Sequence, residues 1–164
     1  MVFKTIQRFN KLVIENKRKM KNFLTRLEKN PPKNLDAIAA AISEEVWQET
    51  NCTSCGNCCK TMTPTFSTKD IKRIAAHFEI NPASFKSTYL YKDKSGDWMN
   101  VQQPCPFLEK KTNLCFIYAI RPADCAGFPY LNKQKMKHYL HVHHQNLAYC
   151  PATYRMVEKL KAMV

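Results

Sequence analysis

Residues 51–60 read NCTSCGNCCK and place four cysteines, in the spacing C-x2-C-x2-C-C, within eight positions. Two residues between thiolates allow one turn of backbone to wrap around a metal ion, with sulfur–metal bonds of about 2.3 Å for zinc. The adjacent pair Cys58 and Cys59 differs, because neighbouring side chains diverge and more easily serve two metal centres, or one centre and a second role. Small and polar residues dominate the segment, which predicts a loop rather than a packed element. Its cysteines are Cys52, Cys55, Cys58 and Cys59.

The remaining cysteines are isolated in the sequence, so the fold has to gather them if they share a metal. The eight are able to form two four-thiolate sites, or one cluster and a smaller site. In a different interpretation, Cys115 and Cys150 bind no metal and pack as small buried apolar side chains. The expected metal is zinc held by four thiolates, or iron, since C-x2-C-x2-C is also the spacing of three ligands in bacterial 4Fe–4S sites. These four additional candidate ligands are Cys105, Cys115, Cys125 and Cys150.

The start of the chain carries no recognisable export signal. Lys and Arg interrupt residues 1–22 every few positions, so the apolar run of a signal peptide is missing. The longest apolar run, Ala37–Ile42, has six residues, whereas a membrane helix needs about 20. We therefore expect a soluble, cytoplasmic protein without a transmembrane segment. In a reducing compartment, eight cysteines are more often metal ligands than disulfides.

Two helices are predicted before the cysteine segment, over residues 1–30 and 35–49, with Pro31 and Pro32 between them. Residues 1–34 hold 10 of the 26 basic and 2 of the 13 acidic residues, a net charge of +8 out of +13. We expect a basic amphipathic helix and linker over 1–34, followed by a metal-binding domain over 35–164. The predicted apolar face of the first helix is Val2, Ile6, Phe9, Val13, Met20, Leu24 and Leu27. That of the second is Leu35, Ile38, Ala39, Ile42, Val46 and Trp47.

Short elements follow the cysteine segment. Ser67 and Asp70 resemble a capping box, Asn81-Pro82 opens another short helix, and Pro151 opens a last one. Hairpins are predicted for 89–91 with 98–101 and for 106–108 with 114–118, a helical turn for 122–126, and a strand through 137–144. The expected fold is α+β, a mostly helical small metal-binding domain with two short hairpins and an N-terminal amphipathic helix.

The cysteine pattern resembles that of the YkgJ-type cysteine cluster proteins, which are described as a zinc- or iron-chelating domain. The resemblance rests on NCTSCGNCC at 51–59, CPFL at 105–108 and CFIYAIRPADCAGFP at 115–129, and Cys150 fits it more loosely. It covers roughly residues 50–150 and implies metal chelation through these cysteines. A similar set occurs in flagellin lysine-N-methylases, but this chain is much shorter and has no methyl-donor motif, so methylase activity is not implied.

Two other groups of residues are candidates for the metal site. Arg121 stands between two cysteines, where a positive charge is able to hydrogen-bond thiolates or a cluster sulfur around the metal. Four histidines crowd into seven positions, which permits a mixed cysteine and histidine site, although we favour a partly exposed polar strand. Asp70 is also a possible site residue, but its place in the capping box with Ser67 already explains it. The histidines are His138, His141, His143 and His144.

No catalytic motif identifies an enzyme, since the sequence lacks a cysteine-nucleophile signature and the patterns of zinc hydrolases and deaminases. The main hypothesis is a zinc- or iron-binding cysteine cluster protein. A first alternative is an iron–sulfur redox protein or enzyme component. A second is a zinc-stabilised interaction module whose residues 1–30 contact an acidic partner, a nucleic acid or another polyanion, or an anionic membrane. The simpler interpretation of residues 1–30 is a solvated basic face.

Overall fold

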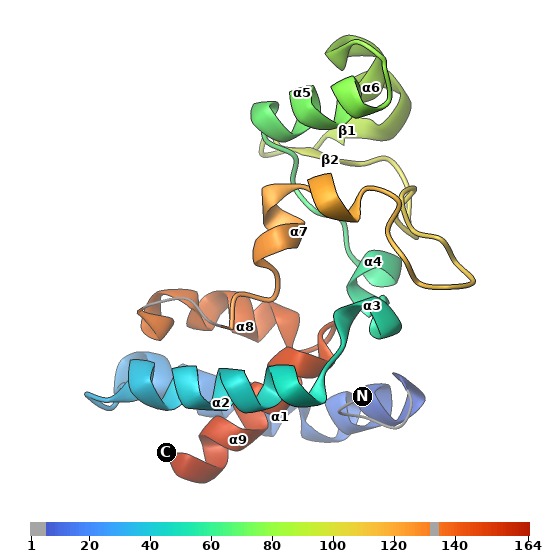
Figure 1. Cartoon of the computed structure of the whole chain (residues 1–164). Helices are drawn as coiled ribbons and strands as arrows, with labels where there is room; N and C mark the ends of the chain where they lie inside the picture. Colours follow the sequence, from blue (N-terminus) through green and yellow to red (C-terminus); the bar gives the residue numbers. More distant parts are fainter. Residues whose placement is uncertain (1–5, 132–134) are drawn as a thin grey trace. The chain divides into compact units, whose positions relative to one another are not determined.

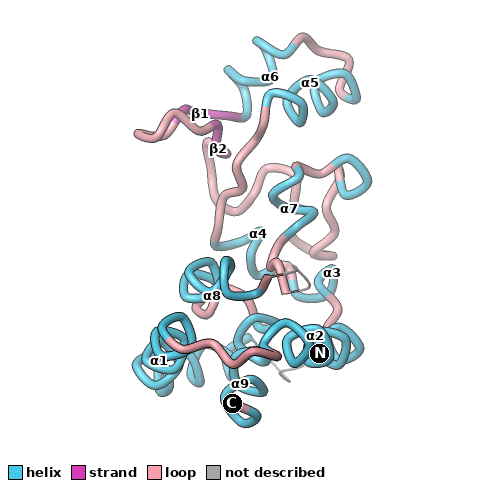
Figure 2. Tube along the Cα trace, turned by 90° about the vertical axis from the view of Figure 1, so that its left-hand side faces the viewer, coloured by secondary structure: helices cyan, strands magenta, loops and turns pink. Residues whose placement is uncertain are grey.

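The computed structural model describes residues 6–131 and 135–164. The chain forms two compact units: unit 1 comprises residues 1–55 with 129–164, and unit 2 comprises residues 56–128 (Figure 1). Helices dominate the described residues, with one two-stranded antiparallel sheet (Figure 2), which confirms the expected α+β, mostly helical class. The functional division predicted at residue 34 stays a prediction. No helix in the described ranges combines the length and apolar character needed to cross a membrane.

All regular secondary structure in the described part of unit 1 is helical. Its core lies between α1, α2, α8 and α9, which pack against one another in pairs. Its elements are α1 (Ile6–Lys29), α2 (Leu35–Glu49), α3 (Cys52–Cys55), the 3-10 helix η2 (Met136–Tyr139), α8 (Leu140–Asn146) and α9 (Pro151–Met163).

Helix α1 is amphipathic, and its apolar face is part of the core of unit 1. Phe9 meets Tyr154 of α9 edge to face, with ring centroids 6.0 Å apart, and the Tyr154 hydroxyl donates to the Leu12 carbonyl at 3.3 Å. Val2 lies outside the described residues, and Ile6 and Val13 are more exposed than the periodicity predicts. The buried residues of α1 are Phe9, Met20, Phe23, Leu24 and Leu27.

Helix α2 has the predicted bounds and packs along α9. Leu35, Ala39, Ile42 and Val46 are buried as predicted, while the predicted Ile38 and Trp47 are half-buried. Lys159 of α9 pairs with two glutamates of α2, Glu45 and Glu49, and Arg155 also contacts Glu49 at 3.6 Å. These exposed pairs add little stability, about 0–1 kcal/mol each, so apolar burial holds the two helices together.

The strand predicted for residues 137–144 is wrong, because η2 and α8 occupy this segment. The two-residue alternation there is short, whereas Leu140, His143, Asn146 and Leu147 recur at helical spacing and are buried. The Asp36 carboxylate of α2 accepts the Met136 N–H at 2.7 Å, which fixes the start of η2. The burial of a helical face therefore outweighs the local alternation.

Unit 2 is built around an aromatic core between two helices and a hairpin. The rings of Phe85 and Phe107 are nearly parallel, at 5° and 6.2 Å, and Phe66, Phe78 and Tyr89 surround them. The elements are α4 (Asn57–Thr61), α5 (Thr68–His77), α6 (Pro82–Tyr89), β1 (Leu90–Lys92), β2 (Trp98–Asn100), the 3-10 helix η1 (Tyr118–Ile120) and α7 (Ala123–Gly127).

The start signals read from the sequence are confirmed in unit 2. Ser67 and Asp70 form a reciprocal capping box on α5, and the Asn81 side chain accepts the Ser84 N–H ahead of α6. The first predicted hairpin is the β1–β2 pair, with Tyr91 opposite Met99. The second is present as one isolated antiparallel bridge between Leu108 and Cys115.

Candidate metal centre

The cysteine segment 51–60, predicted to be a loop, instead contains two short helices, α3 (Cys52–Cys55) and α4 (Asn57–Thr61). Asn51 explains the first turn, α3, because its side-chain oxygen accepts the Thr53 N–H at 3.0 Å and the Thr53 hydroxyl at 2.6 Å. Gly56 separates α3 from α4, with a left-handed φ of 57° that glycine adopts at low cost. Each C-x2-C step therefore lies on or beside a short helical turn.

Replacing Gly56 with alanine is expected to destabilise unit 2 by about 1–2 kcal/mol, because a side chain is strained at this positive φ. The added Cβ would also come within 3.1 Å of the Asn113 Cβ. The loss is measured by urea unfolding, together with the metal content of the purified protein. Gly96→Ala is the control: Gly96 has a φ of 88° but no neighbouring atom within 4 Å, and it lies far from any cysteine in sequence. If both variants bind metal like the wild type, the turn at Gly56 has no role in positioning Cys58 and Cys59.

None of the eight cysteines forms a disulfide, so all eight sulfur donors suited to a soft metal are retained. Cys52 is exposed, Cys150 is buried, and the other six cysteines are half-buried. The division into units separates them: unit 1 contains Cys52, Cys55 and Cys150, and unit 2 contains Cys58, Cys59, Cys105, Cys115 and Cys125.

Backbone hydrogen bonds connect three of the cysteine segments in unit 2. The Cys105 N–H donates to the Cys59 carbonyl at 2.8 Å, which joins α4 to the segment before the second hairpin. Cys115 forms the bridge to Leu108, whose own N–H donates to the Cys105 carbonyl at 3.1 Å. Residues widely separated in sequence are thus fixed next to one another.

Two carboxylates, the buried Asp70 and the half-buried Asp124, position the fourth cysteine segment, α7, which carries Cys125. Asp70 accepts the N–H of Ala123, the first residue of α7, at 3.2 Å. Arg73, paired with Asp70 at 2.7 Å, donates to the Arg121 carbonyl at 3.0 Å. Asp124 accepts the Thr65 N–H at 3.0 Å. Asp70 therefore does more than cap α5, a role that the sequence pattern did not show.

The thiols of unit 2 influence one another electrostatically. The Cys58 thiol, with its sulfur 3.9 Å from that of Cys59, lowers the pKa of Cys59 to about 7. Burial raises the pKa of Cys105 to about 11, with further contributions from Cys59 and Cys115. Burial also raises the pKa of Cys125 strongly, and Cys59, Cys105 and Cys115 act in the same direction. Four thiols from four segments therefore lie within electrostatic range of one another.

Two polar side chains lie beside these thiols. Asn100, buried at the end of β2, donates through Nδ2 to the Cys105 sulfur at 3.4 Å. The sequence offered no signal for Asn100, because its contact arises from the fold. The predicted Arg121 donates to the Tyr118 carbonyl at 2.7 Å and stacks on the Tyr118 ring at 4.0 Å. Burial raises the pKa of Cys115, and the charge of Arg121 opposes this shift.

In unit 1, Cys150 precedes α9 and donates its N–H to the Asn146 carbonyl at 2.8 Å. Burial raises the pKa of Cys150, and the charge of Cys55 raises it further, so these two thiols also interact electrostatically. Cys150 as a whole residue has a relative exposure of 6%.

The four clustered histidines occupy different environments in unit 1. His143 is fully buried, and neither ring nitrogen has a hydrogen-bond partner among the described residues. Burial lowers the pKa of His143 to about 4, assisted by His141 and His144. His144 lies 3.7 Å from the Glu28 carboxylate, whereas His138 and His141 are exposed.

The family model "CxxCxxCC: Putative zinc- or iron-chelating domain" matches residues 51–145, more than half of the chain. The chain belongs to the CxxCxxCC family. An uncharacterized protein of Methanocaldococcus jannaschii is 35% identical over 82 residues, which cover 49% of this chain and 44% of that protein. The matched region thus spans less than half of the relative's length. No solved structure matches this chain. The membership confirms the resemblance seen in the sequence.

The residues present suit the zinc or iron of the family description. Cysteine thiolates are donors that both metals accept in proteins, and Cys105 and Cys125 are partly buried, where a bare thiolate is disfavoured and a cation would offset its charge. Among the described residues, no three His, Cys, Asp or Glu side chains converge closely enough to hold an ion as they stand. The cysteine donors therefore suit a metal ion, and binding it requires the ligand side chains to move closer together.

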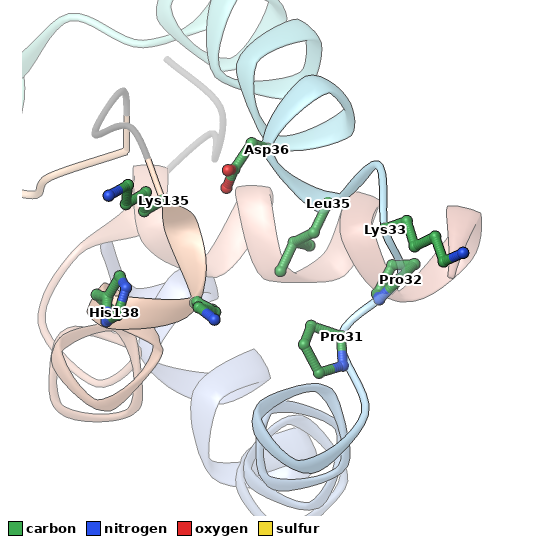
Figure 3. Close-up of a pocket in the computed structure, with 8 residues that line it drawn as sticks. Pro31, Pro32, Lys33, Leu35, Asp36, Lys135 and His138 are labelled. Carbon is green, nitrogen blue, oxygen red and sulfur yellow. The ribbon is translucent and has the colours of Figure 1, made fainter.

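A separate cavity of about 380 Å³ lies in unit 1 and is lined by no cysteine (Figure 3). The Asp36 carboxylate at its wall is already bonded to the Met136 N–H. Its lining is Pro31, Pro32, Lys33, Leu35, Asp36, Lys135, Lys137 and His138. Because exposed lysines and no cysteine line this cavity, it has no part in the family's chelating function.

Proposed function

We propose that this CxxCxxCC protein binds zinc or iron through cysteine thiolates, and that the metal stabilises its fold. All eight cysteines are the proposed donors: Cys52, Cys55, Cys58, Cys59, Cys105, Cys115, Cys125 and Cys150. The observation that carries the proposal is that backbone contacts fix three cysteine segments of unit 2 next to one another: the Cys105 N–H bonds the Cys59 carbonyl, and Leu108, bonded to the Cys105 carbonyl, forms the bridge to Cys115. The raised pKa of Cys125, to which these three thiols contribute, adds a fourth. Packing alone gives no reason to bring so many thiols together.

The charges of unit 2 support a bound cation. Each additional thiolate near Cys59 makes the next one harder to form, because burial and like charge both oppose it. A divalent metal reverses this penalty, since it binds the deprotonated form and neutralises two charges. Cys59, with its pKa of about 7, is the thiol most ready to bind first. We propose that Arg121 offsets part of the remaining negative charge beside Cys115.

The metal content of protein purified without oxygen tests this proposal. We expect at least one equivalent of zinc or iron per chain by elemental analysis. Iron with inorganic sulfide, and a brown colour from sulfur-to-iron charge transfer, would identify the iron–sulfur alternative, whereas colourless protein with zinc would exclude it. Ser54→Ala, a substitution between two cysteines, is the control that should keep the metal. Protein that retains neither metal, even after anaerobic reconstitution, contradicts the proposal.

A second candidate function is contact with a polyanion through the solvent-facing side of α1. This side carries Lys17, Arg18, Lys19 and Lys21, all exposed, and none of them forms an ion pair with an acidic side chain among the described residues. Because the opposite face of α1 is buried in unit 1, deleting the helix would also expose the core. Charge substitution is therefore the appropriate test.

The triple variant Lys17→Gln, Arg18→Gln, Lys21→Gln is expected to weaken binding to a DNA duplex at least tenfold at low salt. Each lost phosphate contact should reduce the slope of log affinity against log salt by about 0.9. Fluorescence anisotropy over a range of salt concentrations measures both effects. The charge-matched control replaces the exposed Lys69, Lys72 and Lys94 of unit 2 with glutamine. Equal binding by the two variants would show that α1 is not a polyanion-binding surface.

A further inference from the structure

The cavity of unit 1 lies between two segments that are distant in sequence but fixed to each other. Residues 31–36 connect α1 to α2 and form the first turn of α2, and residues 135–138 carry most of η2. The Asp36 carboxylate accepts the Met136 N–H at 2.7 Å, and α2 packs against η2. Leu35 and Met136 are both buried, so each segment is anchored in the core of unit 1. The cavity is therefore framed by the folded core rather than by loose loops.

The two walls of the cavity differ in chemistry. Residues 31–36 supply three apolar side chains, and residues 135–138 supply three basic ones (Figure 3). Lys33 extends away from Asp36 and Leu35 in Figure 3, so this lysine is set apart from the basic wall. A ligand that contacts both walls needs an apolar part and a negatively charged group. The apolar residues are Pro31, Pro32 and Leu35, and the basic ones are Lys135, Lys137 and His138.

The basic wall has no acidic side chain to neutralise it. Lys135, Lys137 and His138 form no ion pair in the part of the chain that the structure describes. The one carboxylate among the lining residues, Asp36, is bonded to a backbone N–H. By contrast, Lys159 of α9, in the same unit, pairs with two glutamates. Because positive charges on a concave surface attract anions, the basic wall favours a negatively charged ligand.

Lys135 adopts a backbone conformation that is uncommon for lysine. Its φ of 60° is left-handed, which costs little for glycine but strains a residue that has a Cβ atom. Strained backbone of this kind is concentrated at functional sites, including those that hold ligands. A contact between the Lys135 ammonium group and a ligand would explain why a lysine stands at this position.

We propose that this cavity binds a small organic phosphate, with the phosphate group against Lys135 and Lys137 and the apolar part of the ligand against the proline-rich wall. The cavity volume of about 380 Å³ falls within the range of small-molecule sites. Lysine ammonium groups bind phosphate as point charges, and a phosphate monoester carries close to two negative charges at neutral pH. Two lysines therefore match a phosphate better than a singly charged carboxylate. The site contains no cysteine, so it is independent of the proposed metal binding.

The test titrates phenyl phosphate into the full-length, 15N-labelled protein and follows the backbone amide signals by NMR. We expect saturable shifts at Asp36, Met136 and Lys137, which line or frame the cavity. Inorganic phosphate and phenol should each bind about tenfold more weakly or worse, because each offers only one of the two contacts. Inorganic phosphate that binds as tightly as phenyl phosphate would overturn the role of the apolar wall, and phenol that does so would overturn the role of the lysines.

The double variant Lys135→Gly, Lys137→Gln removes both charges from the basic wall and is expected to weaken phenyl phosphate binding about tenfold at low salt. Its unfolding temperature should not fall below that of the wild type, because glycine relieves the left-handed strain at residue 135. Lys94→Gln, at an exposed position of the β1–β2 turn, is the control and should bind like the wild type.

The metal content of each variant separates this inference from the proposed function. All variants should contain as much zinc or iron as the wild type, since the substitutions lie outside the cysteine segments. If phenyl phosphate causes no saturable shift at the cavity, or if the double variant binds it as tightly as the wild type, only the phosphate site is refuted. Protein that binds phenyl phosphate as expected but takes up neither metal would refute the metal-binding function and leave the phosphate site standing.

Discussion

Replacing Cys59 and Cys115 together with serine is expected to remove the metal from unit 2 and to lower its stability by about 4 kcal/mol. This is the stabilisation that a ligand supplies at a thousand times its dissociation constant. The effect is large because residues 101–117 contain little regular structure and depend on turns and a single bridge. Thermal unfolding followed by circular dichroism, with and without a chelator, measures the loss alongside the metal content.

The chelator provides the internal comparison for this double variant. Wild type should lose stability when the metal is removed, whereas the variant should respond much less, since its unit 2 site is already lost. Thr112→Ser, an exposed substitution in the loop before Cys115, should behave as wild type in both conditions. A wild-type transition that does not change with chelator would show that the metal has no part in holding the fold.

The sequence was sufficient to locate most helix boundaries, because these depend on local chemistry. Pro31 and Pro32 separate α1 from α2, the Ser67 cap begins α5, and Pro151 begins α9, as predicted. The first hairpin likewise follows from two short strand-forming runs, 89–91 and 98–101, on both sides of a polar turn. Proline geometry and side-chain caps act within a few residues, so no knowledge of the tertiary fold was needed.

Features that depend on long-range packing were not predictable in this way. The segment around His143 alternates like a strand, but its buried face against α1 and α9 makes it a helix. The grouping of the cysteines is also a tertiary property, since nothing in the spacing separates Cys55 from Cys58, which belong to different units. Asn100 reaches the Cys105 sulfur only because β2 ends beside it. The candidate ligands were therefore identifiable from sequence, and their grouping was not.

Asp70→Asn is expected to destabilise unit 2 by about 2–4 kcal/mol, because it disrupts a buried carboxylate that accepts four hydrogen bonds. The donors are the N–H and hydroxyl of Ser67, at 3.1 and 2.6 Å, Arg73 at 2.7 Å, and the Ala123 N–H at 3.2 Å. An amide presents an NH2 group in place of one acceptor, so some of these donors lose their partner. Since Ala123 begins the helix that carries Cys125, metal affinity should fall as well. Urea unfolding and metal titration measure the two effects.

The pH dependence distinguishes loss of the carboxylate from a general packing defect. Burial alone would raise the pKa of Asp70, but the hydrogen bonds from Ser67, Arg73 and Ala123 outweigh it and lower the pKa below its usual value. The ionised Asp70 therefore stabilises the fold fully above the ordinary carboxyl pKa of about 3.9, and this contribution disappears as the pH falls through the lowered value. Wild type and Asp70→Asn should differ most near pH 7 and converge in acid. Asp97→Asn, at an exposed position of the β1–β2 turn, should change stability by less than about 0.5 kcal/mol at every pH. A difference between wild type and Asp70→Asn that stays constant with pH would place the loss in packing rather than in the charge of Asp70.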